Sequence, residues 1–168
     1  AQNLGAGDHA RIKKGTVQAL FIVWTMCLIS IAAGLLLSRG GGYLYIFLSP
    51  DKVTAETMRY GNTYLYVDLS LYLFLGFIFV VRNCVQGIGK PQFVLGAGAA
   101  ELAARVSVCL LLPPLIAGGA VNSDAPRAAV YALCFADPFA WMAADAVLLV
   151  PFLRNIMKMD YRYLKGTM

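Results

Sequence analysis

The sequence predicts an all-α, polytopic membrane protein with four transmembrane helices. Of its 168 residues, 60% are hydrophobic and only 14% are charged, whereas soluble domains carry about 25% charged residues. The mean hydropathy is +0.67. Four apolar stretches cover residues 16–37, 60–82, 91–117 and 128–153. Each reaches the roughly 20 residues with which a helix crosses a bilayer, and together they leave little chain for a soluble domain.

The first span is the cleanest, because no charged residue lies between Lys14 and Arg39. Residues 1–15 are mostly polar and are expected to form a cytoplasmic loop. After the span, the run Arg-Gly-Gly-Gly at 39–42 predicts a flexible break. Ser49-Pro50-Asp51 then predicts a helix start near Pro50, with Ser49 as the cap, and this helix should run through the second span to about residue 85.

Prolines punctuate the remaining spans. The segment from Gly87 to Pro91 is expected to end the second span and begin the third. Pro113 and Pro114 should kink or terminate the third span, and Pro138 should kink the fourth.

The basic residues predict the orientation. With four spans, both termini and the central loop lie on one side, and that side is expected to be the cytoplasm by the positive-inside rule. It carries nine lysines and arginines against four on the other side. The nine are Arg11, Lys13, Lys14, Arg82, Lys90, Arg154, Lys158, Arg162 and Lys165, and the four are Arg39, Lys52, Arg59 and Arg127. Residues 155–168 are a basic cytoplasmic tail, with Tyr161 and Tyr163 as expected interface anchors.

Composition also argues against several functions. The net charge of +5 does not indicate nucleic-acid binding, because the basic residues sit at helix ends where they can contact anionic lipid headgroups. The four cysteines lack C-x-x-C spacing and are expected to be apolar core residues. His9, the only histidine, is expected in a surface loop, so we predict no metal site and no cofactor. No catalytic motif of a hydrolase, metalloprotease or nucleotide-binding enzyme is present.

Charged residues inside the predicted spans are the candidates for function, because each costs at least about 2.5 kcal/mol to insert. They are Asp68, Glu101, Arg105, Asp137 and Asp145. Glu101 and Arg105 are four residues apart, which places them on one helical face. This spacing fits either an intrahelical salt bridge that also ties to a neighbouring helix, or a proton or cation relay.

Asp68 lies among tyrosines, including Tyr64 and Tyr72. A carboxylate in an aromatic membrane cavity suits an organic cation, and the alternative is a carboxylate near the water interface that bonds tyrosine hydroxyls. Asp137 and Asp145 are roughly 80° apart around an ideal helix and could face one cavity. Asp137 precedes Pro138, so it could instead bond backbone groups freed by a kink.

Trp141, between these two aspartates, is a third candidate cavity aromatic beside Tyr64 and Tyr72, although packing is the commoner role for such a residue.

Four landmarks in chain order resemble the multidrug and toxic compound extrusion (MATE) family of transporters. The first is formed by residues 1–8 and 11–15, which resemble the cytoplasmic loop after the second helix of a lobe. The second is an R-N-x-x-Q-G-x-G-x-P run at 82–91. The third is an E-L-x-x-R motif at 101–105, and the fourth is a P-x-x-W motif at 138–141. The family-motif residues singled out by this resemblance are Gln2, Asn3, Gly5, Gly7, Arg11, Arg82, Gln86, Gly87, Gly89, Pro91 and Pro138.

This resemblance implies a C-terminal lobe fragment of a twelve-helix transporter, with the four spans as helices nine to twelve. It implies a secondary antiporter of the plasma membrane that exports organic cations or drugs in exchange for Na⁺ or H⁺. The expected partners are membrane lipids, the small-molecule drug and the missing N-terminal helices of the same protein. Asp68, on the tenth helix, would then be a candidate coupling residue.

Three alternatives remain open at the level of sequence. One is a related flippase for lipid-linked oligosaccharides, although only Arg105 could belong to the basic cavity that such a protein needs. Another is a small four-helix membrane scaffold that is complete as it stands. The third is an intramembrane enzyme that uses Asp137 and Asp145.

Overall fold

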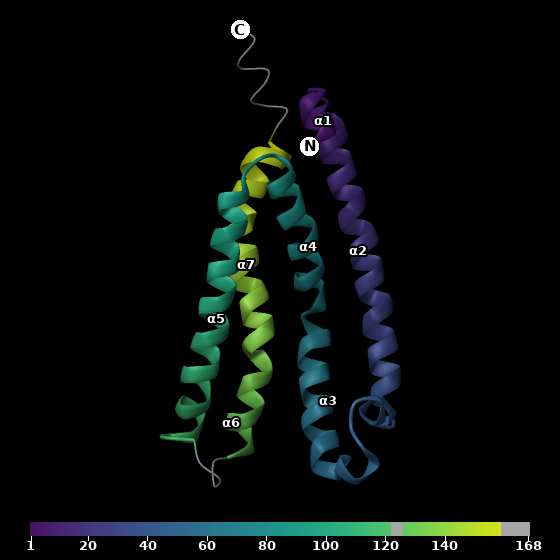
Figure 1. The fold of residues 1–168 in the computed structure, drawn as a ribbon, viewed down its shortest axis with the longest axis vertical. Helices are drawn as coiled ribbons and strands as arrows, with labels where there is room; N and C mark the ends of the chain where they lie inside the picture. The colour runs from purple at the N-terminus through teal and green to yellow at the C-terminus, as the bar shows by residue number, and fades with distance from the viewer. Residues whose placement is uncertain (122–125, 159–168) are drawn as a thin grey trace.

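The structure, a computed structural model, describes residues 1–121 and 126–158, and every regular element in these ranges is a helix (Figure 1). Helix α2 (His9–Ser38), helix α5 (Pro91–Ala117) and the helical segment Arg127–Met157 are each long and apolar enough to cross a membrane. Helices α3 (Ala55–Ser70) and α4 (Tyr72–Gly87) meet this test only as a pair, with a bend of 51° between them. The all-α polytopic fold is confirmed, and one of its four spans is broken.

Helicity begins earlier than the sequence indicated. A short helix α1 (Gln2–Gly5) precedes α2, which starts at His9 because the carboxylate of Asp8 accepts a hydrogen bond from the backbone N–H of Arg11 at 2.9 Å. The expectation of a loop over residues 1–15 is therefore wrong from His9 onward. His9 itself is buried at the first position of α2, not exposed in a surface loop.

The connection between the first two spans contains two short 3₁₀ helices, η1 (Gly42–Ile46) and η2 (Pro50–Lys52). Ser49 makes no side-chain cap bond. The α-helix starts later, where the hydroxyl of Thr54 accepts a hydrogen bond from the backbone N–H of Thr57 at 3.1 Å. The predicted start at Pro50 gave only one 3₁₀ turn, because the chain leaves helical geometry again before Thr54.

The bend between α3 and α4 lies at Leu71, a position without proline or glycine. Leu71 has φ −114° and ψ 12°, and its N–H donates to the carbonyl of Asp68 at 3.2 Å in a tightened turn. The sequence predicted one continuous helix through this position. The turn instead gives α3 and α4 different directions, which matters for the pocket described below.

The prolines lie close to where the helices end or change. Helix α5 continues through Pro113 and Pro114 and ends three residues later at Ala117, where Gly118 adopts φ +73° as a left-handed cap. In the fourth span, Pro138 cannot donate a hydrogen bond to the carbonyl of Cys134, and Cys134 lies in the 3₁₀ segment Leu133–Phe135 that interrupts the α-helix. The irregularity is therefore where the sequence predicted that Pro138 would disturb the span.

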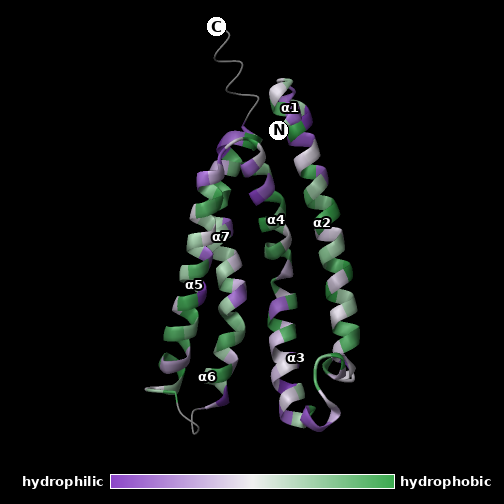
Figure 2. Ribbon diagram, in the orientation of Figure 1, coloured by the Kyte–Doolittle hydropathy of each residue, from purple (hydrophilic) through white to green (hydrophobic). Residues whose placement is uncertain are grey.

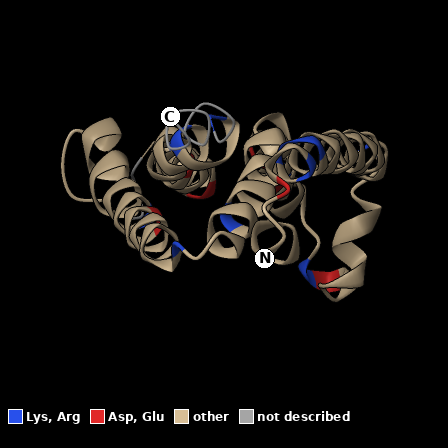
Figure 3. Cartoon of the chain, turned by 90° about the horizontal axis from the view of Figure 1, so that it is seen from above, with Lys and Arg blue, Asp and Glu red and all other residues tan. Residues whose placement is uncertain are grey.

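The fourth span has four pieces, which are α6 (Arg127–Ala132), η3 (Leu133–Phe135), α7 (Ala136–Phe152) and the π-helical turn η4 (Leu153–Met157). Seen from above, the spans form an open row in the order α5, α7, α4, α2 (Figure 3). Helix α7 packs against both α5 and α4, and α2 packs against α4. The N-terminus, the turn before α5 and η4 lie at the same end of the helix bundle, at the top of Figure 1.

The buried core lies between α4, α5 and α7, and it is built from Ile78, Val81, Val85, Ala97, Trp141, Ala144, Leu148, Phe152 and Ile156. Helices α2 and α5 present long apolar surfaces outward (Figure 2). Such surfaces suit lipid or further transmembrane helices. Residues 159–168 are outside the described ranges, and with them Arg162, Lys165 and the expected anchors Tyr161 and Tyr163.

Candidate ion and substrate site

Two helices are joined by a salt bridge between residues that the sequence placed in separate motifs. Arg82 on α4 donates from Nη2 to Oε2 of Glu101 on α5 at 2.8 Å. The other carboxylate oxygen of Glu101 lies 3.5 Å from Nη2 of Arg105, one turn further along α5. The intrahelical pair that ties to a neighbouring helix is therefore confirmed. Arg82, which the sequence placed with the helix-end basic residues, is its partner on that helix.

Asp137 extends this chain of contacts to two more helices. Its Oδ1 accepts a hydrogen bond from Nε of Arg105 at 2.9 Å and forms a salt bridge with Nη2 of the same residue at 2.8 Å. Its Oδ2 accepts a hydrogen bond from the hydroxyl of Tyr64 on α3 at 2.7 Å. The prediction that Asp137 bonds backbone groups freed by a kink is wrong, because both of its oxygens are used by side chains on α5 and α3. We call Arg82, Glu101, Arg105, Asp137 and Tyr64 the polar network.

Asp68 lies beside the polar network without a basic partner. It is close enough to Tyr64 and Asp137 to interact with both, and its Oδ1 is buried with no hydrogen-bond partner. In the described part of the chain, no lysine or arginine lies within ion-pair distance of it. The two arginines of the network balance Glu101 and Asp137, so Asp68 leaves one negative charge uncompensated.

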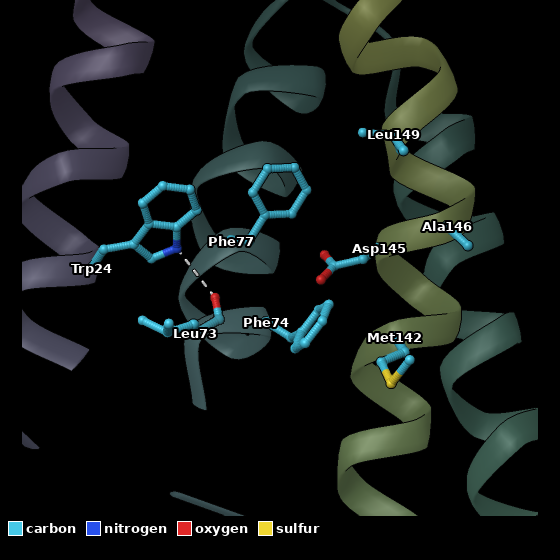
Figure 4. Close-up of a pocket in the computed structure, with 8 residues that line it drawn as sticks. All are labelled: Trp24, Leu73, Phe74, Phe77, Met142, Asp145, Ala146 and Leu149. Atoms are coloured by element: carbon cyan, nitrogen blue, oxygen red, sulfur yellow. Dashed lines mark hydrogen bonds between the residues drawn. The ribbon is translucent and has the colours of Figure 1, made fainter. Parts of the chain in front are cut away.

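Asp145 lies in a different part of the structure from Asp137. Eight residues separate it from Asp137 on α7, which corresponds to a rise of about 12 Å and roughly 80° of rotation. Asp145 lines a pocket between α2, α4 and α7 (Figure 4), whereas Asp137 contacts α3 and α5. The two aspartates therefore do not share one cavity, which also removes the geometry that an aspartate-pair enzyme would need.

The pocket at Asp145 has a volume of about 510 Å³. Figure 4 shows the carboxylate pointing from α7 toward rings on α4, with an indole on α2 opposite. The lining residues are Trp24, Leu73, Phe74, Phe77, Met142, Asp145, Ala146 and Leu149. Asp145 is only 8% exposed, and neither of its carboxylate oxygens has a hydrogen-bond partner in the described residues.

The candidate cavity aromatics divide in the same way. Tyr64 bonds Asp137 in the polar network. Tyr72 and Trp141 instead stack edge to face, with ring centroids 6.4 Å apart, and Trp141 belongs to the buried core. Sequence reasoning missed Trp24, Phe74 and Phe77, since only the bend at Leu71 and the approach of α2 to α4 bring these rings together.

Most of the remaining motif residues lie at the end of the helix bundle that carries the N-terminus. Asn3, Arg11 and Gly87 line a cavity of about 310 Å³ between α1, α2 and α4. Gly7 and Gly89 adopt φ +70° and +77°, which favour glycine, and Pro91 is the first residue of α5. Gln2, Gly5 and Gln86 are exposed.

Within residues 1–121 and 126–158, no three His, Cys, Asp or Glu side chains gather closely enough to hold a metal ion.

Comparison with known proteins identifies a single family. The family model named MatE matches residues 1–111, which include the network residues of α3, α4 and α5. No curated protein and no solved structure matches the chain. Because the matched region covers well over half of the sequence, the chain belongs to the MatE family and is part of a multi-pass membrane transporter.

Proposed function

We propose that this chain is part of a secondary antiporter that exports organic cations or drugs across the plasma membrane in exchange for Na⁺ or H⁺, with both of its ends in the cytoplasm. Membership of a transporter family supports the general activity. The excess of basic residues on the side of the membrane that carries the N-terminus supports the cytoplasmic orientation of both ends.

The observation that carries the proposal is the uncompensated charge of Asp68. A charged carboxylate at membrane depth costs at least about 2.5 kcal/mol, and a bound cation removes that cost. Both H⁺ and Na⁺ can bind an aspartate, and the Tyr64 hydroxyl and Asp137 supply further oxygens close by.

The polar network favours this activity over the lipid-linked oligosaccharide flippase. A pyrophosphate-linked lipid needs unpaired cations inside the membrane. The two arginines of the polar network, Arg82 and Arg105, are both already paired with Glu101, and Arg105 is also paired with Asp137. Membership of a transporter family likewise favours this activity over the membrane scaffold.

The test is gradient-driven efflux of a fluorescent organic cation from cells that express the complete transporter. We expect Asp68→Asn to reduce efflux at least tenfold and to abolish its dependence on the Na⁺ or H⁺ gradient. Asp51→Asn is the matched control, because Asp51 is exposed in η2 and the chemical change is the same. If Asp68→Asn, present in the membrane at wild-type levels, exports with the same ion dependence, the role of Asp68 is refuted.

A further inference from the structure

The pocket at Asp145 is separate from the polar network and is not used by the coupling role of Asp68. We propose that it binds the organic cation itself, as a bulky monovalent cation with aromatic or branched apolar groups. This inference rests on the proposed antiporter and assigns its substrate to a second site, between α2, α4 and α7.

Charge is the first argument. Asp145 is more than nine-tenths buried, points into the pocket, and has no hydrogen-bond partner on either oxygen (Figure 4). Arg82 is close enough to Asp145 to interact with it electrostatically. Its Nη2, however, donates to Glu101, and it is not within ion-pair distance of Asp145. A buried carboxylate in this position attracts a positive ligand, because a cation would replace the hydration that the carboxylate has lost.

The lining decides which kind of cation fits. A hard inorganic ion such as Na⁺ takes several oxygen ligands, as hard cations generally do, and the pocket wall is almost entirely hydrocarbon. The carbonyl oxygen of Leu73 is already bonded, since it accepts from Nε1 of Trp24 at 3.2 Å. An organic ammonium or phosphonium, whose charge is spread over apolar groups, needs no such set of ligands.

Three aromatic side chains, Trp24, Phe74 and Phe77, supply a second attraction. The face of an aromatic ring attracts a cation that lies within about 6 Å of the ring centroid. Two of these rings are held in place, Trp24 by its bond to Leu73 and Phe77 by an edge-to-face contact with Phe152 at 5.9 Å. Phe74 is freer, and Met142 can adjust to ligands of different shape.

Size agrees with this class of ligand. The volume of about 510 Å³ lies within the range of about 300–1,000 Å³ that is typical of small-molecule pockets. The pocket begins directly after the bend at Leu71, because Leu73 and Phe74 lie in the first turn of α4.

The experiment is equilibrium binding of radiolabelled tetraphenylphosphonium to the complete transporter in nanodiscs. We expect Asp145→Asn to weaken binding at least tenfold and Phe74→Leu to weaken it about threefold. Phe74 is chosen over Phe77 because it makes no ring contact with the core. Asp51→Asn should bind as the wild type does. Tetraphenylborate, an anion of the same shape, should not compete for the site.

A second measurement guards against an Asp145 variant that fails to fold. Leu149 lines the pocket and is partly exposed, so a Leu149→Cys thiol should react with a maleimide and be protected by tetraphenylphosphonium. Asp51→Cys, exposed in η2 outside the spans, should react equally with and without the ligand. Wild-type affinity in Asp145→Asn, or the absence of protection at Leu149→Cys, would overturn the site.

These results separate the two proposals. If tetraphenylphosphonium binds with the expected dependence on Asp145 but no ion gradient drives export, the pocket stands and the antiporter fails. If gradient-driven export needs Asp68 while binding is indifferent to Asp145, the antiporter stands and the pocket fails.

Discussion

The contact between Arg105 and Asp137 should be the strongest single polar link between α5 and α7. Arg105 donates a hydrogen bond from Nε to the Oδ1 of Asp137 at 2.9 Å and forms a salt bridge from Nη2 to the same oxygen at 2.8 Å. We consider a double-mutant cycle with Arg105→Gln, Asp137→Asn and the two changes combined. These substitutions keep the approximate volume of each side chain and remove its charge, so the cycle isolates the energy of the pair.

The magnitude follows from the partial burial of the pair. Hydrogen bonds to charged groups contribute about 1.5–3 kcal/mol when buried, and exposed ion pairs contribute about 0.2–1 kcal/mol. The two side chains are 39% and 30% exposed, which places the contact between these cases. Interhelical polar contacts measured in a membrane protein reach about 1.7 kcal/mol. We therefore expect a coupling energy of about 1.5 kcal/mol.

The assay is reversible unfolding of the complete transporter in mixed detergent and SDS micelles, with the free energy of unfolding measured for all four forms. The chain contains its own control cycle, because Arg127 and Glu56 are 4.0 Å apart and each is 62% exposed. That pair should show a coupling energy below about 0.5 kcal/mol. A coupling energy between Arg105 and Asp137 no larger than the control would refute the structural role assigned to this link.

Two further predictions concern the backbone. At Gly76, an added Cβ would meet the Sγ of Cys27 at 2.7 Å, so Gly76→Ala should lower the free energy of unfolding by about 1–3 kcal/mol. Gly98→Ala, where nothing lies within 4 Å, should raise it by about 0.5–1 kcal/mol; equal effects at both sites would contradict the packing of α2 on α4. Thr54→Ala should cost about 1 kcal/mol through loss of the α3 cap, whereas Ser49→Ala should cost almost nothing, as the same unfolding measurement would show.

The number of spans could be predicted from the sequence because hydropathy over about 20 residues depends on composition alone. The bend at Leu71 could not, since no proline or glycine marks it. The cap at Thr54 was missed for a different reason. Ser49-Pro50-Asp51 is an equally good local start signal, and only the three-dimensional course of the chain decides which start the α-helix uses.

The site could be predicted in part. The spacing of Glu101 and Arg105 identified their contact, because a helix fixes which residues share a face. The partners from other helices, Arg82 and Tyr64, could not be found in this way. A distance of 19 residues between Arg82 and Glu101, or of 73 between Tyr64 and Asp137, carries no periodic signal.

The structure also suggests why the two carboxylates proposed to bind cations, Asp68 and Asp145, lie outside the family landmarks. Arg82, Glu101 and Arg105 belong to the landmark motifs, and Asp137 directly precedes the last one. In space these residues neutralise one another and hold α4, α5 and α7 together. Charges that are used up in this way are poor binding sites for an additional cation.

Asp68 and Asp145 lie outside the landmark motifs, and in the described chain neither has a basic partner at ion-pair distance. Asp68 sits among oxygen atoms and Asp145 among aromatic rings. A small cation is stabilised by the first environment and a large organic cation by the second. We therefore expect the coupling ion to bind at Asp68 and the organic cation at Asp145, the two carboxylates without a basic partner. The motifs that identify the family mainly hold the helices together.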